Sequence, residues 1–78
     1  MSQVTIYTTP SCVYCRMAKQ FFQENSVNYE EKNVATDTEA RDAMITKSGQ
    51  MGVPVIEVDG KIVIGFDQPR LKELLNIE

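Results

Sequence analysis

Histidine is absent from this 78-residue sequence, and cysteine occurs only twice. The lack of histidine excludes the commonest general base, the catalytic triads that depend on it and most zinc sites. A surplus of basic residues is also lacking, because eight lysine and arginine residues are set against eleven acidic ones and the formal net charge is −3. This balance disfavours binding to nucleic acid or to an anionic membrane surface.

Long apolar runs are missing as well. No segment approaches the roughly 18 consecutive apolar residues that a membrane-spanning helix needs. Residues 1–3 lead into a short segment with polar flanks, unlike the apolar stretch of a secretory signal peptide. We therefore expect a cytoplasmic protein that does not bind a membrane, and we interpret its cysteines in a reducing compartment.

The residues that are present have the composition of an ordinary folded domain, with 42% hydrophobic and 24% charged residues. A chain of this length supports one small hydrophobic core. The sequence contains no linker, low-complexity segment or internal repeat. The expected organisation is a single domain over residues 1–78.

Seven segments of alternating type are predicted from the apolar periodicity and the turn residues. Strands are expected at 4–8, 27–34, 53–58 and 61–64, and helices at 12–25, 36–48 and 67–75. Thr36 and Glu39 form a predicted capping box for the second helix, and Asp59-Gly60 predicts a tight hairpin between the last two strands. The order β-α-β-α-β-β-α predicts an α/β fold, with a four-stranded mixed sheet flanked by three helices.

The chemistry of the sequence is concentrated in the motif Cys12-Val13-Tyr14-Cys15. Random placement of two cysteines gives this spacing in about one case in forty, and the motif directly follows a strand at a predicted helix start. Unpaired N–H groups and the helix dipole favour a thiolate at Cys12, and such sites lower a cysteine pKa from ~8.5 to about 3.5–7.5. Cys15 lies one turn further along, where it is less stabilised as a thiolate but close enough for a disulfide. The pattern predicts a redox-active dithiol in which Cys12 attacks and Cys15 resolves the mixed disulfide.

Three other interpretations of the cysteine pair stay open. A structural disulfide across so short a loop stabilises the fold by only about 2 kcal/mol and does not persist in a reducing cytosol. Half of a zinc site needs two further ligands, which would be carboxylates or the thiols of a second chain in a metal-bridged dimer. Two inert core cysteines are the third interpretation, which the position at a helix start disfavours.

The neighbouring residues have simpler interpretations. Arg16 and Lys19 add positive charge near the cysteines, although a solvated helix face also explains both. Met17 and Met44 are expected to fill the core. Pro54 stands at the start of a predicted strand, where proline is tolerated.

Three motifs follow one another along the chain. They are the Cys12–Cys15 motif after a strand, Gly52-Val53-Pro54 before a hairpin, and Gly65-Phe66-Asp67 at the start of the last helix. Together they resemble the motifs of glutaredoxins. The resemblance covers residues 4–75 and keeps the order and spacing of the family. It implies the thioredoxin fold, in which Pro54 follows a cis peptide bond and lies against the active-site disulfide.

The same resemblance implies a binding site for glutathione. The backbone of Val53 would pair with the cysteinyl part of glutathione. Phe66 and Asp67 would hold its γ-glutamyl end at a helix N-terminus, a place that attracts a carboxylate. The other residues expected around this pocket are Thr9, Tyr14, Gln50 and Pro54. No metal and no bound cofactor are expected, since glutathione would be a co-substrate.

The sequence departs from the usual glutaredoxin pattern at three places. Val13 replaces a proline, Thr9 replaces a lysine or arginine that faces a carboxylate of glutathione, and Ile64-Gly65 replaces a pair of glycines. Val13 and the placement of Phe66 resemble the small glutaredoxin-like electron donors of ribonucleotide reductase, which thioredoxin reductase reduces. Thioredoxin itself is disfavoured by the short chain and by the absence of tryptophan before the motif.

The sequence thus predicts a monomeric, glutathione-dependent oxidoreductase that reduces protein disulfides and glutathionylated proteins through Cys12 and Cys15. An electron donor for ribonucleotide reductase, itself reduced by thioredoxin reductase, is the alternative with the same chemistry. A metal- or cluster-bridged dimer that acts as a carrier through Cys12 is the alternative of another class. The metal content of the purified protein separates this last alternative from the other two.

Overall fold

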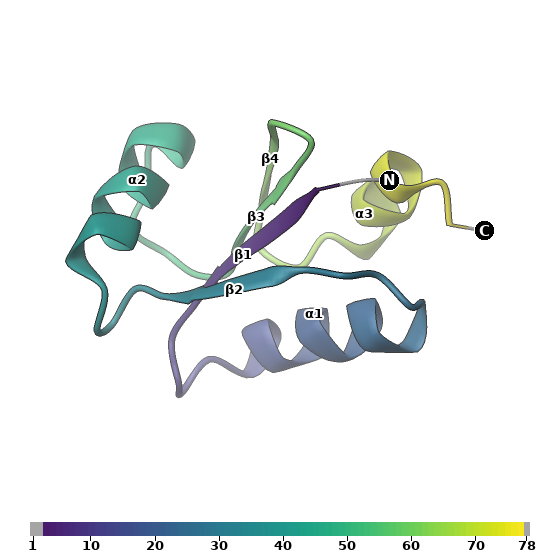
Figure 1. The fold of residues 1–78 in the computed structure, drawn as a ribbon, viewed down its shortest axis with the longest axis horizontal. Coiled ribbons are helices and arrows are strands. Elements are labelled where there is room, and N and C mark those ends of the chain that lie inside the picture. Colours follow the sequence, from purple (N-terminus) through teal and green to yellow (C-terminus); the bar gives the residue numbers. More distant parts are fainter. Residues whose placement is uncertain (1–2, 78) are drawn as a thin grey trace.

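The seven predicted elements are all present, in the predicted order, in the computed structural model of the chain, which describes residues 3–77 (Figure 1). The strands are β1 (Val4–Thr8), β2 (Glu30–Asn33), β3 (Val55–Val58) and β4 (Lys61–Ile64). The helices are α1 (Val13–Glu24), α2 (Thr38–Ser48) and α3 (Gln68–Leu75). Within the described residues, no helix is both long enough and apolar enough to cross a membrane.

The four strands form one mixed sheet in the order β2-β1-β3-β4. Strand β1 runs parallel to β2 and antiparallel to β3, and β3 pairs with β4 in an antiparallel hairpin. Tyr7 lies opposite Val55 in the register of β1 with β3. The last residues of β1 and the first residues of β3 therefore lie at the same end of the sheet. The segments that flank them lie side by side there.

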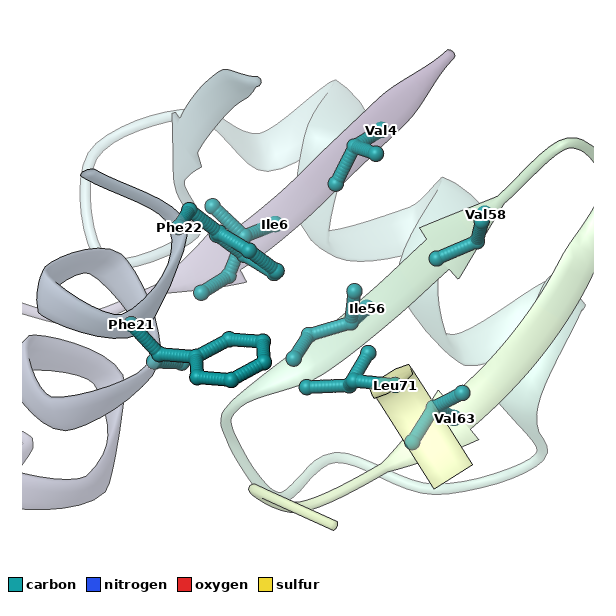
Figure 2. Close-up of a cluster of buried hydrophobic side chains, with 9 residues drawn as sticks. Val4, Ile6, Phe21, Phe22, Ile56, Val58, Val63 and Leu71 are labelled. Atoms are coloured by element: carbon teal, nitrogen blue, oxygen red, sulfur yellow. The ribbon is translucent and has the colours of Figure 1, made fainter. Parts of the chain in front are cut away.

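Each face of the sheet is covered by different helices, because successive residues of a strand point to opposite faces. Val4 and Ile6 of β1 face α1 and α3, whereas Tyr7 lies in a second cluster with Ala40 and Met44 of α2. Figure 2 shows the larger cluster, in which Phe21 and Phe22 of α1 and Leu71 of α3 approach the strands. The labelled members of this cluster are Val4, Ile6, Phe21, Phe22, Ile56, Val58, Val63 and Leu71. Complete burial of one such side chain contributes about 1.5–3 kcal/mol, so this layer fixes α1 on the sheet.

Strand β2 is shorter than the predicted strand at 27–34 because its first residues close helix α1 instead. Ser26 has a positive φ of 55°, its N–H donates to the carbonyl of Gln23, and the N–H of Val27 donates to the carbonyl of Phe22 at 2.8 Å. This is the hydrogen-bond pattern of a Schellman motif, which satisfies carbonyl groups at a helix end. The apolar side chain of Val27 packs on the core as part of this helix end.

The N-cap of α2 is Asp37, and the predicted capping box of Thr36 and Glu39 is wrong. The Asp37 carboxylate accepts a hydrogen bond from the N–H of Ala40 at 3.0 Å, whereas the Thr36 hydroxyl donates to the carbonyl of Asn33. Both residue types are good N-caps, and the extended backbone at Asp37 decides between them.

The prediction that Met17 fills the core is also wrong. Met44 is buried, with 1% of its surface exposed, whereas Met17 is 44% exposed. Helical spacing alone does not distinguish the two, because Met17 lies at the edge of the apolar stripe of α1.

We expect Asp37→Ala to lower the free energy of unfolding by about 1 kcal/mol, because the substitution removes the N-cap hydrogen bond of α2. Thr36→Ala is the matched control and should cost clearly less, since its hydroxyl makes only a 3.4 Å contact outside the helix. Urea denaturation of both variants measures the difference. A larger loss for Thr36→Ala would contradict the assignment of the cap.

Candidate active site

The two cysteines lie where β1 ends and α1 begins. Cys12 is the N-cap of α1, and its sulfur accepts a hydrogen bond from the backbone N–H of Cys15 at 3.1 Å. The N–H of Cys12 donates to the carbonyl of Thr9 at 3.3 Å, which closes the turn between strand and helix. The two cysteines form a disulfide, with their Cα atoms 5.2 Å apart. This Cα separation lies within the usual range for a disulfide, so the backbone of the motif is placed for the bond.

The two sulfur atoms differ in access. Cys12 is partly exposed, whereas Cys15 is buried in the protein with 1% of its surface exposed. Cys12 also faces the N-terminus of α1, and the first turn of this helix carries no acidic residue that would offset the partial positive charge there. An external sulfur can therefore reach Cys12, which lies in the more favourable field for a thiolate.

The segment before β3 lies beside the dithiol. Because Val55 pairs with Tyr7 near the end of β1, Pro54 lies close to the loop that carries Thr9 and Cys12. The peptide bond between Val53 and Pro54 is cis, as the resemblance implies. Pro54 is buried, whereas Val53 is half-buried.

The segment before α3 joins the same region. The N–H of Gly65 donates to the carbonyl of Pro54 at 2.8 Å, which holds the start of this segment against the proline. Asp67 is the N-cap of α3, where its carboxylate accepts from the N–H of Arg70 at 3.3 Å. The ring of Phe66 packs edge-on against Phe21 of α1, with ring centroids 5.8 Å apart. Three segments that are far apart in the sequence thus meet at one end of the sheet.

The remaining predicted site residues are less constrained. Tyr14 is 63% exposed in the first turn of α1, so its ring is available to a ligand at Cys12. Gln50 makes its backbone contacts within its own loop, where its N–H donates to the hydroxyl of Ser48 and its carbonyl accepts from it. The place of both residues in a binding pocket stays a prediction.

Four exposed apolar side chains lie in the segments that carry the dithiol and precede Pro54, and we call them the apolar rim. They are Val13, Tyr14 and Met17 of α1 and Met51 of the loop before β3, each between 44% and 63% exposed. Met17 also lines a shallow cavity of about 220 Å³ between α1 and the start of α3, together with Phe21 and Phe66. Exposed apolar side chains of this kind are common where a protein receives a partner.

A polar network next to the site was not predicted from the sequence. The hydroxyl of Thr8 donates to a carboxylate oxygen of Glu31 at 2.8 Å, and the ammonium group of Lys19 contacts the same oxygen at 2.9 Å. The hydrogen bond from Lys19 and then that from Thr8 lower the pKa of Glu31 below its usual value. The signal in the sequence is the alternation of β1, because Val4, Ile6 and Thr8 share the face that carries α1.

Among residues 3–77, no three His, Cys, Asp or Glu side chains are grouped so that they could hold a metal ion.

Known proteins share this arrangement. The family model described as Glutaredoxin matches residues 4–63. A glutaredoxin-like 8.6 kDa protein from the rubredoxin operon of Clostridium pasteurianum is 36% identical over 72 residues, which are 92% of this chain and 96% of that protein. Glutaredoxin 3 of Escherichia coli is 34% identical over 67 residues, which are 86% of this chain and 81% of the relative.

A solved structure agrees with these sequence matches. The crystal structure of a variant of the thioredoxin-like protein BC3987 superposes with a TM-score of 0.92 at 36% identity and covers 96% of each chain. The family match extends from β1 through the dithiol and Pro54 into β4, so it includes most of the site described above. With Cys12 and Cys15 joined at the start of α1, this chain belongs to the glutaredoxin family of thiol-disulfide oxidoreductases.

Proposed function

We propose that this protein reduces protein disulfides and glutathione mixed disulfides in the cytoplasm, as a monomer, with glutathione as its reductant. The observation that carries the proposal is the asymmetry of the dithiol, in which a partly exposed Cys12 caps α1 and a buried Cys15 lies one turn behind it. Glutathione is the co-substrate of the family to which the chain belongs.

The reaction consists of two exchanges of sulfur. The thiolate of Cys12 attacks one sulfur of the target disulfide, and the other target sulfur leaves as a thiolate that takes a proton from water. Cys15 then loses its proton and attacks the sulfur of Cys12. The Cys12–Cys15 disulfide forms, the second target thiolate leaves, and two electrons have passed to the target.

Reduction of the protein requires two glutathione molecules. The first attacks the Cys12–Cys15 disulfide, binds to Cys12 as a mixed disulfide and releases the thiol of Cys15. The second attacks the glutathione sulfur of this mixed disulfide, which restores the Cys12 thiol and yields glutathione disulfide. Two glutathione thiols are oxidised for each protein disulfide that is reduced.

The segments around the dithiol support a site for the glutathione backbone. The half-buried Val53 offers main-chain groups for strand-like pairing with the cysteinyl part of glutathione. At the start of α3 the helix dipole and the N–H of Gln68 favour a carboxylate, because Pro69 has no N–H and that of Arg70 already donates to Asp67. The exposed carboxylate of Asp67 can receive the amino group of the γ-glutamyl end. The Phe66 ring already packs on Phe21, so Phe66 contributes its backbone in this proposal.

A second electron source is favoured by the apolar rim and by Thr9. A partner protein such as thioredoxin reductase would cover exposed Val13, Tyr14 and Met17, whereas glutathione lacks the apolar surface to do so. Thr9 supplies no charge for a carboxylate of glutathione. In this candidate function the protein passes electrons from thioredoxin reductase to a larger enzyme such as ribonucleotide reductase, by the same chemistry at Cys12 and Cys15.

The two cysteines should respond differently to substitution. Cys12→Ser should abolish all disulfide reduction, because it removes the accessible one of the two cysteine thiols and leaves the buried Cys15. Cys15→Ser should still reduce glutathione mixed disulfides, since a second glutathione resolves the intermediate, but should lose most of its activity on protein disulfides. Rates of iodoacetamide labelling on each reduced single variant, measured as a function of pH, provide a direct comparison of the two thiols. Equal labelling of both thiols, or faster labelling of Cys15, would overturn the assignment.

Thr9→Lys should improve the use of glutathione. A lysine here adds one partly exposed charge pair worth about 0.5–1 kcal/mol, which is a few-fold decrease in the apparent Michaelis constant for glutathione. Since salt screens exposed charges, the gain should shrink at high ionic strength. Asn28→Lys is the matched control, because Asn28 is exposed and precedes β2 at the opposite end of the sheet.

A coupled assay distinguishes the two electron sources. The wild-type protein is offered glutathione with glutathione reductase, or thioredoxin reductase with its own cofactor, against one disulfide substrate. If the protein turns over with thioredoxin reductase but not with glutathione, the second candidate function replaces the glutathione proposal. If Thr9→Lys has no effect while glutathione works well, the pocket is assigned wrongly although the activity stands.

A further inference from the structure

A lysine and a glutamate form an ion pair close to the dithiol. The ammonium nitrogen of Lys19 and a carboxylate oxygen of Glu31 are 2.9 Å apart, and their side chains are 26% and 39% exposed. The same oxygen accepts the hydroxyl of Thr8, which is the one buried polar residue among those described. The partners come from α1, β2 and β1, so the pair connects the helix of the dithiol to two strands.

The position of this pair relates it to both cysteines. Lys19 follows Cys15 by four residues on α1, and residues at this spacing are neighbours on a helix surface. Thr8 is the last residue of β1 and leads directly into the loop that ends at Cys12. Glu31 lies opposite Ile6 in the register of β1 with β2, on the sheet face that carries α1. Lys19 is therefore about one helical turn from Cys15 and about two from Cys12.

Other charged groups near this place are few. Arg16 lies on α1 one turn after Cys12 and is exposed, and Glu30 and Lys32 of β2 alternate with Glu31 and so belong to the opposite sheet face. Helix α3, the other element on this face, forms its own ion pair between Arg70 and Glu73. Lys19 in the second turn of α1 and Glu31 of β2 are thus the ion pair between α1 and the sheet on this face.

We propose that Lys19 and Glu31 are positioning residues that together set the reduction potential of the Cys12–Cys15 dithiol. Glu31, held by Thr8, fixes the Lys19 ammonium beside α1 and at the same time offsets its charge. Reduction creates a thiolate, which a nearby cation stabilises and a nearby carboxylate destabilises. A stabilised thiolate makes the reduced protein more favourable and so raises the potential. The inference rests on the proposed function only in taking the dithiol as the reacting group.

The proposal predicts opposite effects for the two partners. Glu31→Gln leaves the charge of Lys19 without its offset, so the reduced form should become more favourable. Lys19→Met leaves the charge of Glu31 alone, so the reduced form should become less favourable. Coulomb interaction at about one to two helical turns, screened by water, gives a change of about two- to tenfold in the equilibrium constant for each. The double variant should lie close to wild type.

The chain contains a matched control. Lys47 of α2 and Glu57 of β3 form an equally short ion pair, 2.8 Å apart, on the opposite face of the sheet. Lys47→Met and Glu57→Gln make the same chemical changes away from the dithiol. Neither should change the equilibrium constant by more than the error of the measurement.

The experiment is equilibration of each purified protein with mixtures of reduced and oxidised dithiothreitol, at a pH where Cys12 is ionised. The fraction of reduced protein gives the equilibrium constant, and urea denaturation of each variant reports its stability separately. Opposite shifts for Lys19→Met and Glu31→Gln, absent from the control pair, are expected. Shifts of the same sign, or no shift in either variant, would overturn the proposal and leave the pair a structural one.

Dithiothreitol also separates this test from that of the proposed function. It equilibrates with a dithiol whether or not the protein accepts glutathione. A negative result in the glutathione assay therefore does not contradict the role proposed for Lys19 and Glu31. An unchanged equilibrium constant in their variants likewise does not contradict the proposed function.

Discussion

The parallel pairing of β1 with β2 is the constraint on which the site depends. Two neighbouring parallel strands need a crossover, and helix α1 supplies it on one face of the sheet. The helix must therefore begin at the end of the sheet where β1 stops. Its N-terminus, with Cys12 as the cap, lies at that end. Phe21 and Phe22 then hold the helix against the strands, and the direction of its dipole follows from the chain connection alone.

The antiparallel pairing of β1 with β3 completes the site from the other side. Because β3 begins at the end of the sheet where β1 stops, the residues before Val55 lie next to those after Tyr7. The hydrogen bond from Gly65 to Pro54 then adds the start of α3. No single segment contains the candidate site, and the pairing of strands brings its three segments together. The residues of the site are therefore spread over motifs that lie dozens of residues apart in the sequence.

The sequence was sufficient for the order of the elements, the sheet composition and the dithiol. These features rest on local signals, such as the β-branched residues of Val4–Thr8, the turn at Asp59-Gly60 and the cysteine spacing at a helix start. The cis bond before Pro54 came from the family resemblance and not from a local rule. The errors have two causes. The local backbone conformation selects Asp37 over Thr36 as the N-cap and makes Val27 part of a helix end, and the residue types do not distinguish these arrangements. Tertiary packing leaves Met17 at the surface, and a single sequence does not display that packing. The ion pair of Lys19 with Glu31 was missed for the same reason, since its partners lie on different elements.

The burial of Cys15 has a consequence for chemical damage. Because its sulfur lies beneath the surface, the reduced protein presents a single thiol to peroxides and to other reagents in solution. An oxidised Cys12 sulfur can then be captured from within by Cys15, which converts a sulfenic acid into the ordinary disulfide before it is oxidised further. Thiol-disulfide exchange and the capture of a sulfenic acid therefore end in the same product, the Cys12–Cys15 disulfide. Reduction of this disulfide restores the protein after either reaction.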